Sequence, residues 1–380
     1  MLVGIPKEIY PGEDRVSVIP SGIQFLTNAG FDVIVQNGAG EGAHFDDDEY
    51  RNAGASIAPD AAALYQQADL VLKVRHPVGD EAELLKEGST LICMLDAWFN
   101  KPLVKRLAER NVRTFALEFI PRITRAQSMD VLSSMAAISG YRAVLSGAMA
   151  LPQYFPMLMT AAGTIHPAKV FIVGAGVAGL MAISTARRLG AVVEAYDTRV
   201  EVKEQVMSLG AKFVEFDLPQ QQGAATGGYA QQQSEEFYRR QREQMAAKVA
   251  QSDLVITTAA IPGKPSPRLI TADMLKLMKK GSVVVDLAAE RGGNVEGTEV
   301  NKKIYKDGVT IIGYIDHPAK VPVHASQLFT KNINTFLLNM AKEGELRMNM
   351  EDEIVAATLV TENGEIKHQG LREQIEKESA

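Results

Sequence analysis

Short apolar runs alternate with amphipathic stretches along the N-terminal third of the chain. The runs are rich in β-branched residues, which is typical of buried strands. They lie at residues 2–5, 31–35, 69–74, 90–95 and 112–117. Stretches with helical periodicity lie between them, at residues 21–28, 60–67, 80–86 and 102–110. Strands that alternate with helices predict a parallel sheet with helices on its faces.

The same alternation continues after a long apolar helix predicted at residues 132–151. Further strands are predicted at residues 170–173, 192–195, 212–216, 254–257, 282–287 and 309–312, with helices at 180–189, 200–209 and 234–250. A second long helix is predicted at 325–341. Two short β-type runs, 356–361 and 365–368, flank Asn363-Gly364 and predict a hairpin.

This pattern predicts an α/β protein with two Rossmann-like domains whose sheets are mostly parallel. The N-terminal domain is expected to comprise residues 1–132, completed by the C-terminal segment 328–380. The second domain is expected at residues 133–327. The two long helices would join the domains, with a cleft between them. A chain of 380 residues is too long for one compact core, which agrees with two domains.

Composition excludes several classes of protein. The net charge of −6 argues against a nucleic-acid surface. Cys93 is the only cysteine, so no intramolecular disulfide forms and a reducing, cytoplasmic setting is expected. The N-terminus lacks the apolar segment of a signal peptide. No run of about 18 apolar residues occurs, because residues 131–163 are interrupted, so we expect no direct membrane insertion.

A dinucleotide fingerprint follows the strand at residues 170–173. Gly174, Gly176 and Gly179 form G-x-G-x-x-G, a helix follows, and the next strand ends at Asp197. Glycines permit a tight turn and a close approach of a pyrophosphate to the backbone, and the helix N-terminus favours its charge. Asp197 can accept hydrogen bonds from a ribose, which favours NAD(H). Arg199 leaves NADP(H) open, because an arginine can accept a 2′-phosphate.

A second glycine-rich segment, residues 38–43, also fits the pattern formally. Glu41 lies inside it and Asp46, Asp47, Asp48 and Glu49 follow. These acids would repel a pyrophosphate, so we interpret the segment as a turn before an acid-rich helix start.

Two polar segments interrupt the regular pattern. Residues 122–130 place two arginines, an amide and a carboxylate between a strand and a long helix, where ligands often bind; a solvated loop is the alternative. Residues 217–233 are rich in Gln and Gly, and Tyr229 follows two glycines. One aromatic residue on flexible arms is typical of a closing flap.

Other catalytic chemistry is not indicated. No pair of the six histidines has metal-ligand spacing, so we expect no metal site. Ser133 and Ser134 are interpreted first as a helix N-cap.

Several segments together resemble the NAD(H)-binding component of proton-translocating nicotinamide nucleotide transhydrogenase. They are VGAGVAGLMAISTARRLGAVVEAYDTR, PRITRAQSMDVLSS with GYRAV behind it, GGYA and TTAAIPGKPSP. The likeness extends from the N-terminal GIPKE and GEDRV to the helix near residues 332–334, which is most of the chain.

The resemblance implies a homodimer and direct hydride transfer between NAD(H) here and NADP(H) on a separate component. A membrane-spanning component would couple this Re/Si-specific transfer to proton translocation, which places the chain in the cytoplasm, peripheral to the inner face of the cell membrane. The catalytic residues implied are Arg122, Gln127, Asp130 and Ser133. The cofactor-binding residues implied are Ile123, Thr124, Arg125, Gly174, Gly176, Val177, Gly179, Asp197, Thr198, Arg199, Gly228, Tyr229, Gln241 and Ala260, with Gly228, Tyr229 and Gln241 in the flap and Ala260 beside the nicotinamide.

Two alternatives remain at this point. Alanine dehydrogenase shares the fold, and Arg15 and Lys73 match its substrate-binding positions. That family uses a proton-transferring histidine where this chain has Met94, and a thioether cannot move a proton. Hydride transfer between two nicotinamide rings needs position and dryness, not an acid or base. The other alternative is a non-catalytic protein that senses NAD(H).

Overall fold

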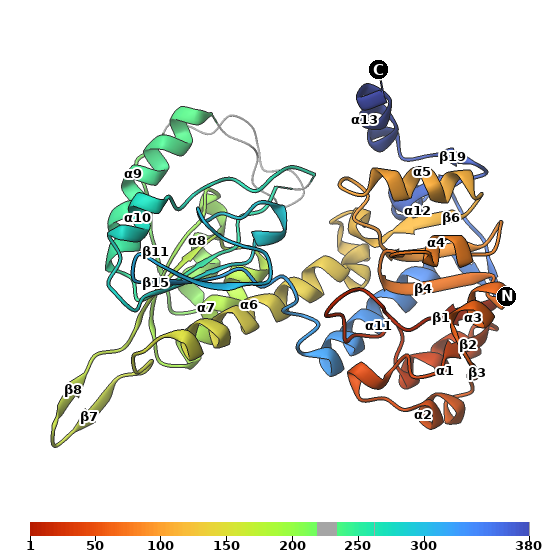
Figure 1. The fold of residues 1–380 in the computed structure, drawn as a ribbon, viewed down its shortest axis with the longest axis horizontal. Helices are drawn as coiled ribbons and strands as arrows, with labels where there is room; N and C mark the ends of the chain where they lie inside the picture. Colours follow the sequence, from red (N-terminus) through yellow and green to blue (C-terminus); the bar gives the residue numbers. More distant parts are fainter. Residues whose placement is uncertain (219–233, 262, 380) are drawn as a thin grey trace. The chain divides into compact units, whose positions relative to one another are not determined.

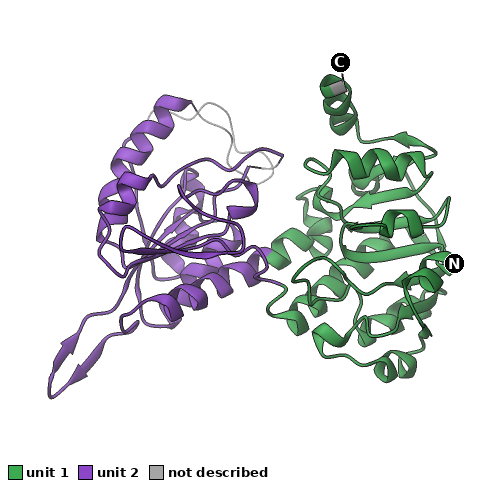
Figure 2. Ribbon diagram, viewed as in Figure 1, with its two compact units in different colours: residues 1–135, 319–380 green, residues 136–318 purple. Residues whose placement is uncertain are grey.

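The computed structural model describes residues 1–218, 234–261 and 263–379, and it divides the chain into two compact units (Figure 2). The first unit contains residues 1–135 and 319–380, and the second contains residues 136–318. Helix α6 (Val131–Ala150) begins in the first unit and continues in the second. Helix α11 (Pro322–Asn339) lies in the first unit.

Within the described residues, the first unit is built on an eight-stranded sheet in the order β19-β18-β6-β5-β4-β1-β2-β3 (Figure 1). Its strands are β1 (Leu2–Ile5), β2 (Asp32–Gln36), β3 (Ser56–Ala58), β4 (Leu70–Arg75), β5 (Thr90–Met94), β6 (Arg113–Ala116), β18 (Leu359–Glu362) and β19 (Glu365–Ile366). Strands β1 to β6 pair with one another in parallel, as the alternating pattern predicts. The helices are α1 (Pro20–Asn28), α2 (Asp47–Asn52), α3 (Ala61–Gln67), α4 (Glu81–Leu84), α5 (Lys101–Glu109), α11, α12 (Glu353–Thr358) and α13 (Gln369–Ser379).

The C-terminal hairpin lies at the edge of this sheet. Strands β18 and β19 are antiparallel, and Asn363 and Gly364 both have positive φ, as a two-residue type I′ turn requires. The hairpin is therefore confirmed, and β18 pairs antiparallel with β6. The expected strand at 356–361 is wrong in its first half, because residues 353–358 form α12. The side chain of Asp352 caps that helix by accepting from Ile354 N.

The second unit contains, over its described residues, a seven-stranded sheet in the order β11-β10-β9-β12-β13-β15-β14. Its strands are β9 (Lys169–Val173), β10 (Val192–Tyr196), β11 (Lys212–Phe213), β12 (Leu254–Thr257), β13 (Val283–Asp286), β14 (Lys303–Lys306) and β15 (Val309–Ile312). The helices are α7 (Val177–Arg188), α8 (Lys203–Ser208), α9 (Glu235–Gln251) and α10 (Ala272–Lys276), in addition to α6. Only the β14–β15 pair in this sheet is antiparallel among the described strands.

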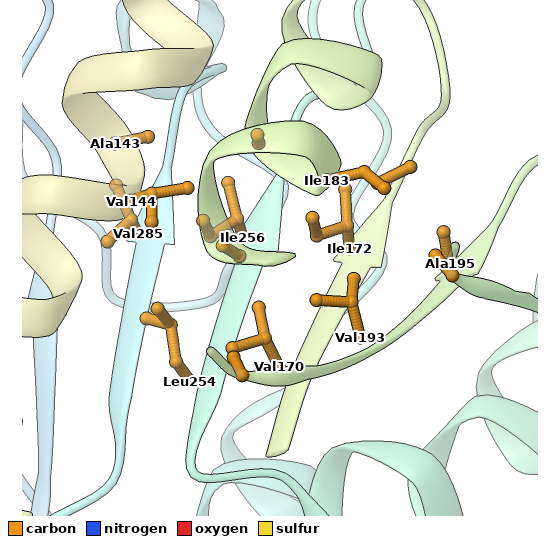
Figure 3. Packing of buried hydrophobic residues seen from close by; sticks show 14 of the residues in the cluster. Ala143, Val144, Val170, Ile172, Ile183, Val193, Ala195, Leu254, Ile256 and Val285 are labelled. Carbon is orange, nitrogen blue, oxygen red and sulfur yellow. The ribbon is translucent and has the colours of Figure 1, made fainter. Parts of the chain in front are cut away.

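The core of the second unit lies on both faces of its sheet. Alternate residues of β9 point to opposite faces: Val170 and Ile172 pack with residues of α6 and α7, whereas Phe171 and Val173 pack with residues of α9 and α10. Figure 3 shows the first of these layers. Coverage of both faces explains why these strands are continuous apolar runs in the sequence.

Several short elements were not predicted from the pattern. They are β3, β7 (Leu158–Thr160), β8 (Gly163–Ile165), α10, β14, β16 (Ala341–Lys342), β17 (Glu345–Leu346) and α13. Strands β7 and β8 form an antiparallel hairpin that extends away from the sheet of the second unit (Figure 1). All of them except α13 have two to five residues, which is too few positions to show a periodicity.

The second glycine-rich segment is a turn followed by an acid-rich helix, as predicted. Residues 41–43 form a 3₁₀ turn, and Glu41 pairs with Lys7 at 3.0 Å. Asp46 and Glu49 form a capping box at the start of α2. Their carboxylates therefore already bind backbone N–H groups of their own helix.

Candidate nucleotide-binding site

The glycine loop between β9 and α7 has the geometry of a phosphate cradle. Gly174 has φ +101°, and a Cβ at Gly179 would lie 1.9 Å from the carbonyl oxygen of Gly174. These two positions therefore need glycine for the turn and for helix packing. A Cβ at Gly176 would meet only Arg199 Nη2, at 3.9 Å. The backbone there is open to a pyrophosphate at the N-terminus of α7, so the loop fits a dinucleotide.

Asp197 follows β10 and is tied to this loop. Its Oδ2 accepts a hydrogen bond from Ala175 N at 2.7 Å and from Arg199 Nη2 at 2.9 Å. Its Oδ1 accepts from Arg199 N and Nε, both at 2.9 Å. Four hydrogen bonds use the roughly four lone-pair sites of a carboxylate. A ribose hydroxyl must therefore replace bonds that Arg199 makes. Thr198, half-buried, lies between the two residues.

The loop after β12 borders the same edge of the sheet. Thr258 Oγ1 lies 3.2 Å from Gly174 O and donates to it, which connects this loop to the glycine loop. Ala260 is exposed just beyond. The strand order reverses between β9 and β12, and dinucleotides bind across such a switch point in open α/β sheets. Val177, 40 % exposed at the start of α7, lies at this edge as well.

The residues expected in the flap divide into two groups. Gly228 and Tyr229 lie outside the described residues. Gln241 lies in the middle of α9, is 2 % exposed, and donates from Nε2 to Tyr196 Oη at 2.9 Å. Burial raises the pKa of Tyr196 to about 12, so its hydroxyl stays neutral and Gln241 supports the end of β10.

The polar loop before α6 is a 3₁₀ segment, Thr124–Met129. Asp130 caps the helix that follows: its Oδ1 accepts from Ser133 N at 2.9 Å and its Oδ2 from Ser133 Oγ at 2.6 Å. The expectation that Ser133 or Ser134 is the N-cap is therefore wrong. Ser133 stands three residues inside the cap, where Asp130 fixes its hydroxyl.

Three other contacts fix this loop within the first unit. Arg125 makes two hydrogen bonds to the Asp352 carboxylate, and this pairing lowers the pKa of Asp352. Asn332 Nδ2 on α11 donates to Ser128 O at 2.8 Å. The Gln127 side chain is exposed on the loop held this way. Arg122 and Thr124 are also exposed, and Ile123 is half-buried.

Comparison with known proteins decides the family. The family model of the alanine dehydrogenase/PNT N-terminal domain matches residues 4–139, and the model of the corresponding C-terminal domain matches residues 143–369. The chain belongs to this family.

Within the family, transhydrogenase subunits are the more similar relatives. The chain is 49% identical over 382 residues to an NAD(P) transhydrogenase subunit alpha polypeptide of Rhodospirillum rubrum, covering 98% of this chain and 100% of that protein. It is 46% identical to subunit alpha of Cereibacter sphaeroides, covering 96% of this chain and 71% of that protein. A crystal structure of transhydrogenase from Sinorhizobium meliloti has a TM-score of 0.85 and 44% identity, over 97% of this chain and 100% of that one. Alanine dehydrogenase of Halomonas elongata is 31% identical over 98% of this chain and 96% of that protein.

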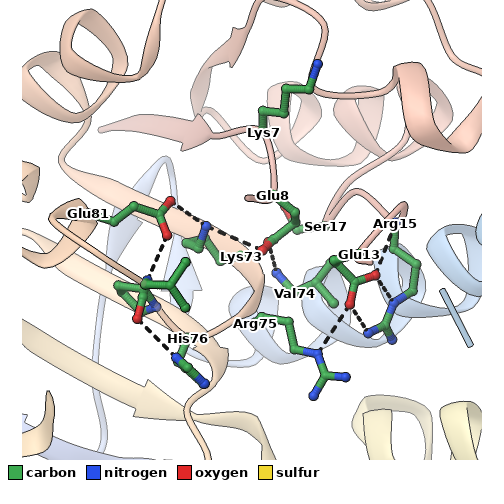
Figure 4. Close-up of polar contacts among 12 residues, drawn as sticks. Lys7, Glu8, Glu13, Arg15, Ser17, Lys73, Val74, Arg75, His76 and Glu81 are labelled. Atoms are coloured by element: carbon green, nitrogen blue, oxygen red, sulfur yellow. Dashed lines mark hydrogen bonds and ion pairs between the residues drawn. The ribbon is translucent and has the colours of Figure 1, made fainter. Parts of the chain in front are cut away.

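Arg15 and Lys73, which were expected to match alanine dehydrogenase substrate positions, lie among buried ion pairs of the first unit (Figure 4). Lys73 Nζ lies 2.8 Å from Glu81 Oε1 and 3.4 Å from Glu8 Oε2. Burial lowers the pKa of Lys73, but the two carboxylates outweigh burial and raise it overall. Arg15 pairs with Glu13, with Nη2 to Oε2 at 2.6 Å, while Arg15 Nη1 is buried without a hydrogen-bond partner.

Met94 ends β5, opposite Arg75 of β4. A thioether accepts and donates no proton at this point, unlike a histidine.

The described residues meet neither the requirements of a metal-ligand cluster nor those of a membrane-spanning helix. Those residues include no group of three or more histidine, cysteine, aspartate or glutamate side chains suited to hold a metal ion. Of the helices they form, none is both long and apolar enough to cross a bilayer.

Sequence reasoning missed two residues of this site. Thr258 ties the glycine loop to the next loop, and Asn294 holds that loop from the turn after β13. For Asn294 the sequence shows only an asparagine that follows two glycines. The hydrogen-bond partners of its side chain, Pro267 and Ala259, lie 27 and 35 residues away.

Proposed function

We propose that this chain is the NAD(H)-binding component of a Re/Si-specific, proton-translocating NAD(P) transhydrogenase. It binds NAD(H), a separate component binds NADP(H), and hydride passes directly between the two nicotinamide rings. A membrane-spanning component couples this transfer to proton translocation. The chain acts as a homodimer in the cytoplasm, peripheral to the inner face of the cell membrane.

The observation that carries the proposal is the bond between Asp197 and the glycine loop. Ala175 N donates to the carboxylate at 2.7 Å, so an acid suited to a ribose is held beside a backbone open to a pyrophosphate. The identity of 49% to a transhydrogenase subunit over nearly the whole chain supports the same function.

Each group of residues has a role in this proposal. Gly174, Gly176, Val177 and Gly179 hold the pyrophosphate, and Asp197, Thr198 and Arg199 hold the adenosine ribose. Ala260 borders the nicotinamide. Arg122, Gln127, Asp130 and Ser133 orient the nicotinamide end, assisted by Ile123, Thr124 and Arg125. Gly228 and Tyr229 close over the nucleotide, and Gln241 supports that region from α9.

Bound NADH supplies the hydride, so the chain's own residues only bind, orient and exclude water. Asp130 is suited to orienting, because both of its oxygens are fixed to Ser133. The exposed amide of Gln127 can reach a second nucleotide brought by a partner.

Dimer formation is supported by the β7–β8 hairpin. Met157, Met159 and Ile165 are 58%, 72% and 47% exposed, and apolar side chains gathered on one hairpin favour burial against a protein surface. Replacing all three with serine should shift the protein from dimer to monomer in light scattering. A variant that stays dimeric would remove the hairpin from the interface.

The experiment that tests the function mixes the protein with an NADP(H)-loaded partner component and an NADH analogue of distinct absorbance. We expect absorbance changes from direct transfer, and none with L-alanine and NAD⁺ in a parallel cuvette. Turnover of alanine would favour the amino-acid oxidoreductase, to which the buried Arg15 and Lys73 also fit. NADH binding without turnover under any pairing would favour a sensor.

A further inference from the structure

The amide of Asn294 binds both ends of the loop that follows β12. Its Nδ2 donates to Ala259 O and to Pro267 O, each at 2.9 Å, and its Oδ1 accepts from Ala259 N at 3.0 Å. The residue is 0% exposed. Its own carbonyl oxygen accepts from Leu269 N and Ile270 N. One side chain therefore joins the two ends of this loop, Ala259 and Pro267, by hydrogen bonds.

The backbone next to Asn294 is fixed in turn by Asp286, the last residue of β13. Its Oδ2 accepts from Val295 N at 3.0 Å and from Thr298 Oγ1 at 2.8 Å. Its Oδ1 accepts from Thr257 Oγ1 at 3.1 Å. Asp286 is also 0% exposed. One oxygen of Asp286 thus binds the segment that follows Asn294, and the other binds β12. The asparagine therefore has little freedom to move relative to β12 and β13.

The position of this loop links it to the nucleotide. Asp197 stands on the β10 side of the glycine loop and marks the adenosine half. The other half of a dinucleotide must then extend over β12, on the far side of the switch point. The loop from Ala259 starts at the end of β12, and Thr258 ties it to Gly174. Its backbone therefore borders the nicotinamide half.

We propose that Asn294 is a positioning residue for hydride transfer: it fixes the backbone at Ala259 and at Pro267, and Ala259 and Ala260 then border the nicotinamide ring at a fixed position. This inference rests on the proposed function. Asn294 does not touch the reacting atoms. Transfer between two rings depends on their distance and angle, and a displacement of about 1 Å can cost about 100-fold in rate. Loss of the Asn294 hydrogen bonds should therefore reduce the rate of hydride transfer more than the affinity for NADH.

The test compares Asn294→Ala and Asn294→Asp in the full chain with a matched control. Asn294→Asp keeps the acceptor for Ala259 N but loses both donated bonds. The control is Asn334→Ala on α11: Asn334 is 5% exposed and its Nδ2 donates to Gly22 O at 2.9 Å, in the first unit. It loses a comparable buried amide bond away from the nucleotide loops.

Three measurements separate positioning from a general loss of structure. NADH titration by fluorescence gives Kd, stopped-flow absorbance with the NADP(H)-loaded partner gives the transfer rate, and hydrogen exchange reports on the peptide that contains Ala259. We expect both Asn294 variants to slow transfer about 10- to 100-fold with Kd changed less than about threefold. Exchange at Ala259 should rise in Asn294→Ala and stay slow in Asn294→Asp.

The outcomes are distinct. Transfer within about twofold of wild type in both folded Asn294 variants would overturn the inference, as would an equal loss in Asn334→Ala. A wild-type protein that binds NADH but transfers no hydride would overturn the proposed function instead. If Asn294→Ala does not fold, Asn294→Asp and the exchange measurement decide the question.

Discussion

Removal of the Asp197 carboxylate is the most direct test of the nucleotide site. The side chain is 6% exposed and accepts four hydrogen bonds, three of them from Arg199. In Asp197→Ala, Ala175 N and the Arg199 guanidinium lose this partner, and a bound ribose loses its acceptor. We expect weaker NADH binding with the fold retained.

The magnitude follows from an exchange of partners. A hydrogen bond to a charged group contributes about 1.5–3 kcal/mol net. The ribose gains such bonds only by replacing bonds from Arg199, so the binding loss should amount to one of them and not to the sum. One bond corresponds to about a 10- to 150-fold higher Kd, since about 1.4 kcal/mol is a factor of ten.

NADH fluorescence titration measures this change, with thermal unfolding to check that the variant is folded. Glu194→Ala is the matched control, because Glu194 lies on β10, the strand that Asp197 follows, and pairs with Lys248 at 2.8 Å at a partly exposed position. Such pairs contribute about 0–1 kcal/mol, so NADH affinity should not change. Equal NADH affinity in wild type and folded Asp197→Ala would refute the assignment of this acid.

Two further variants test the loop and the core. Gln127→Asn shortens an exposed amide side chain and should slow hydride transfer, because the rate depends on the position of the two rings. NADH affinity, from fluorescence titration, should stay within about threefold, while stopped-flow absorbance gives the transfer rate. A large loss of affinity with normal turnover would instead assign Gln127 to NADH binding. His317→Gln tests a buried histidine whose pKa burial lowers to about 4. In the unfolded chain this histidine binds a proton at about pH 6.5. The free energy of unfolding therefore falls by up to about 3 kcal/mol as pH falls from about 6.5 to about 4, and this stability is fully present above about pH 6.5. Urea titrations at several pH values should show that the free energy of unfolding decreases more steeply in wild type than in the variant below about pH 6.5. The same pH dependence in both proteins would contradict the reasoning.

The parts of the fold that were predictable share a cause. Strand β9 and its neighbours are covered on both faces, so they appear in the sequence as mostly apolar runs. Helix α12 was missed because β-branched residues within it favour strand, whereas the cap from Asp352 decides for helix. The assignment of a cap to Ser133 failed for a related reason. Asp130 and Ser133 are both good caps, and only the helix start separates them.

The site shows a different limit. The contact between the glycine loop and Asp197 could be anticipated because both lie within one strand–loop–helix–strand unit. Asn294 was not, because its partners Ala259 and Pro267 come from another loop of the sheet. No local pattern distinguishes an asparagine with three such bonds from one in an open turn.

The occupied carboxylate of Asp197 has a consequence for turnover. In the proposed function, a ribose that binds Asp197 replaces bonds from Arg199, so the acid adds about one hydrogen bond to the affinity and not the sum of several, and it also selects hydroxyls over a 2′-phosphate. A component that must take up NADH and release NAD⁺ in every cycle is served by such an exchange, because tight uniform binding would slow release. In the proposed function, Arg199 binds the acid again when the nucleotide leaves. Its Nη2 lies 3.9 Å from the position of a Cβ at Gly176, so the same guanidinium stands beside the pyrophosphate loop as well.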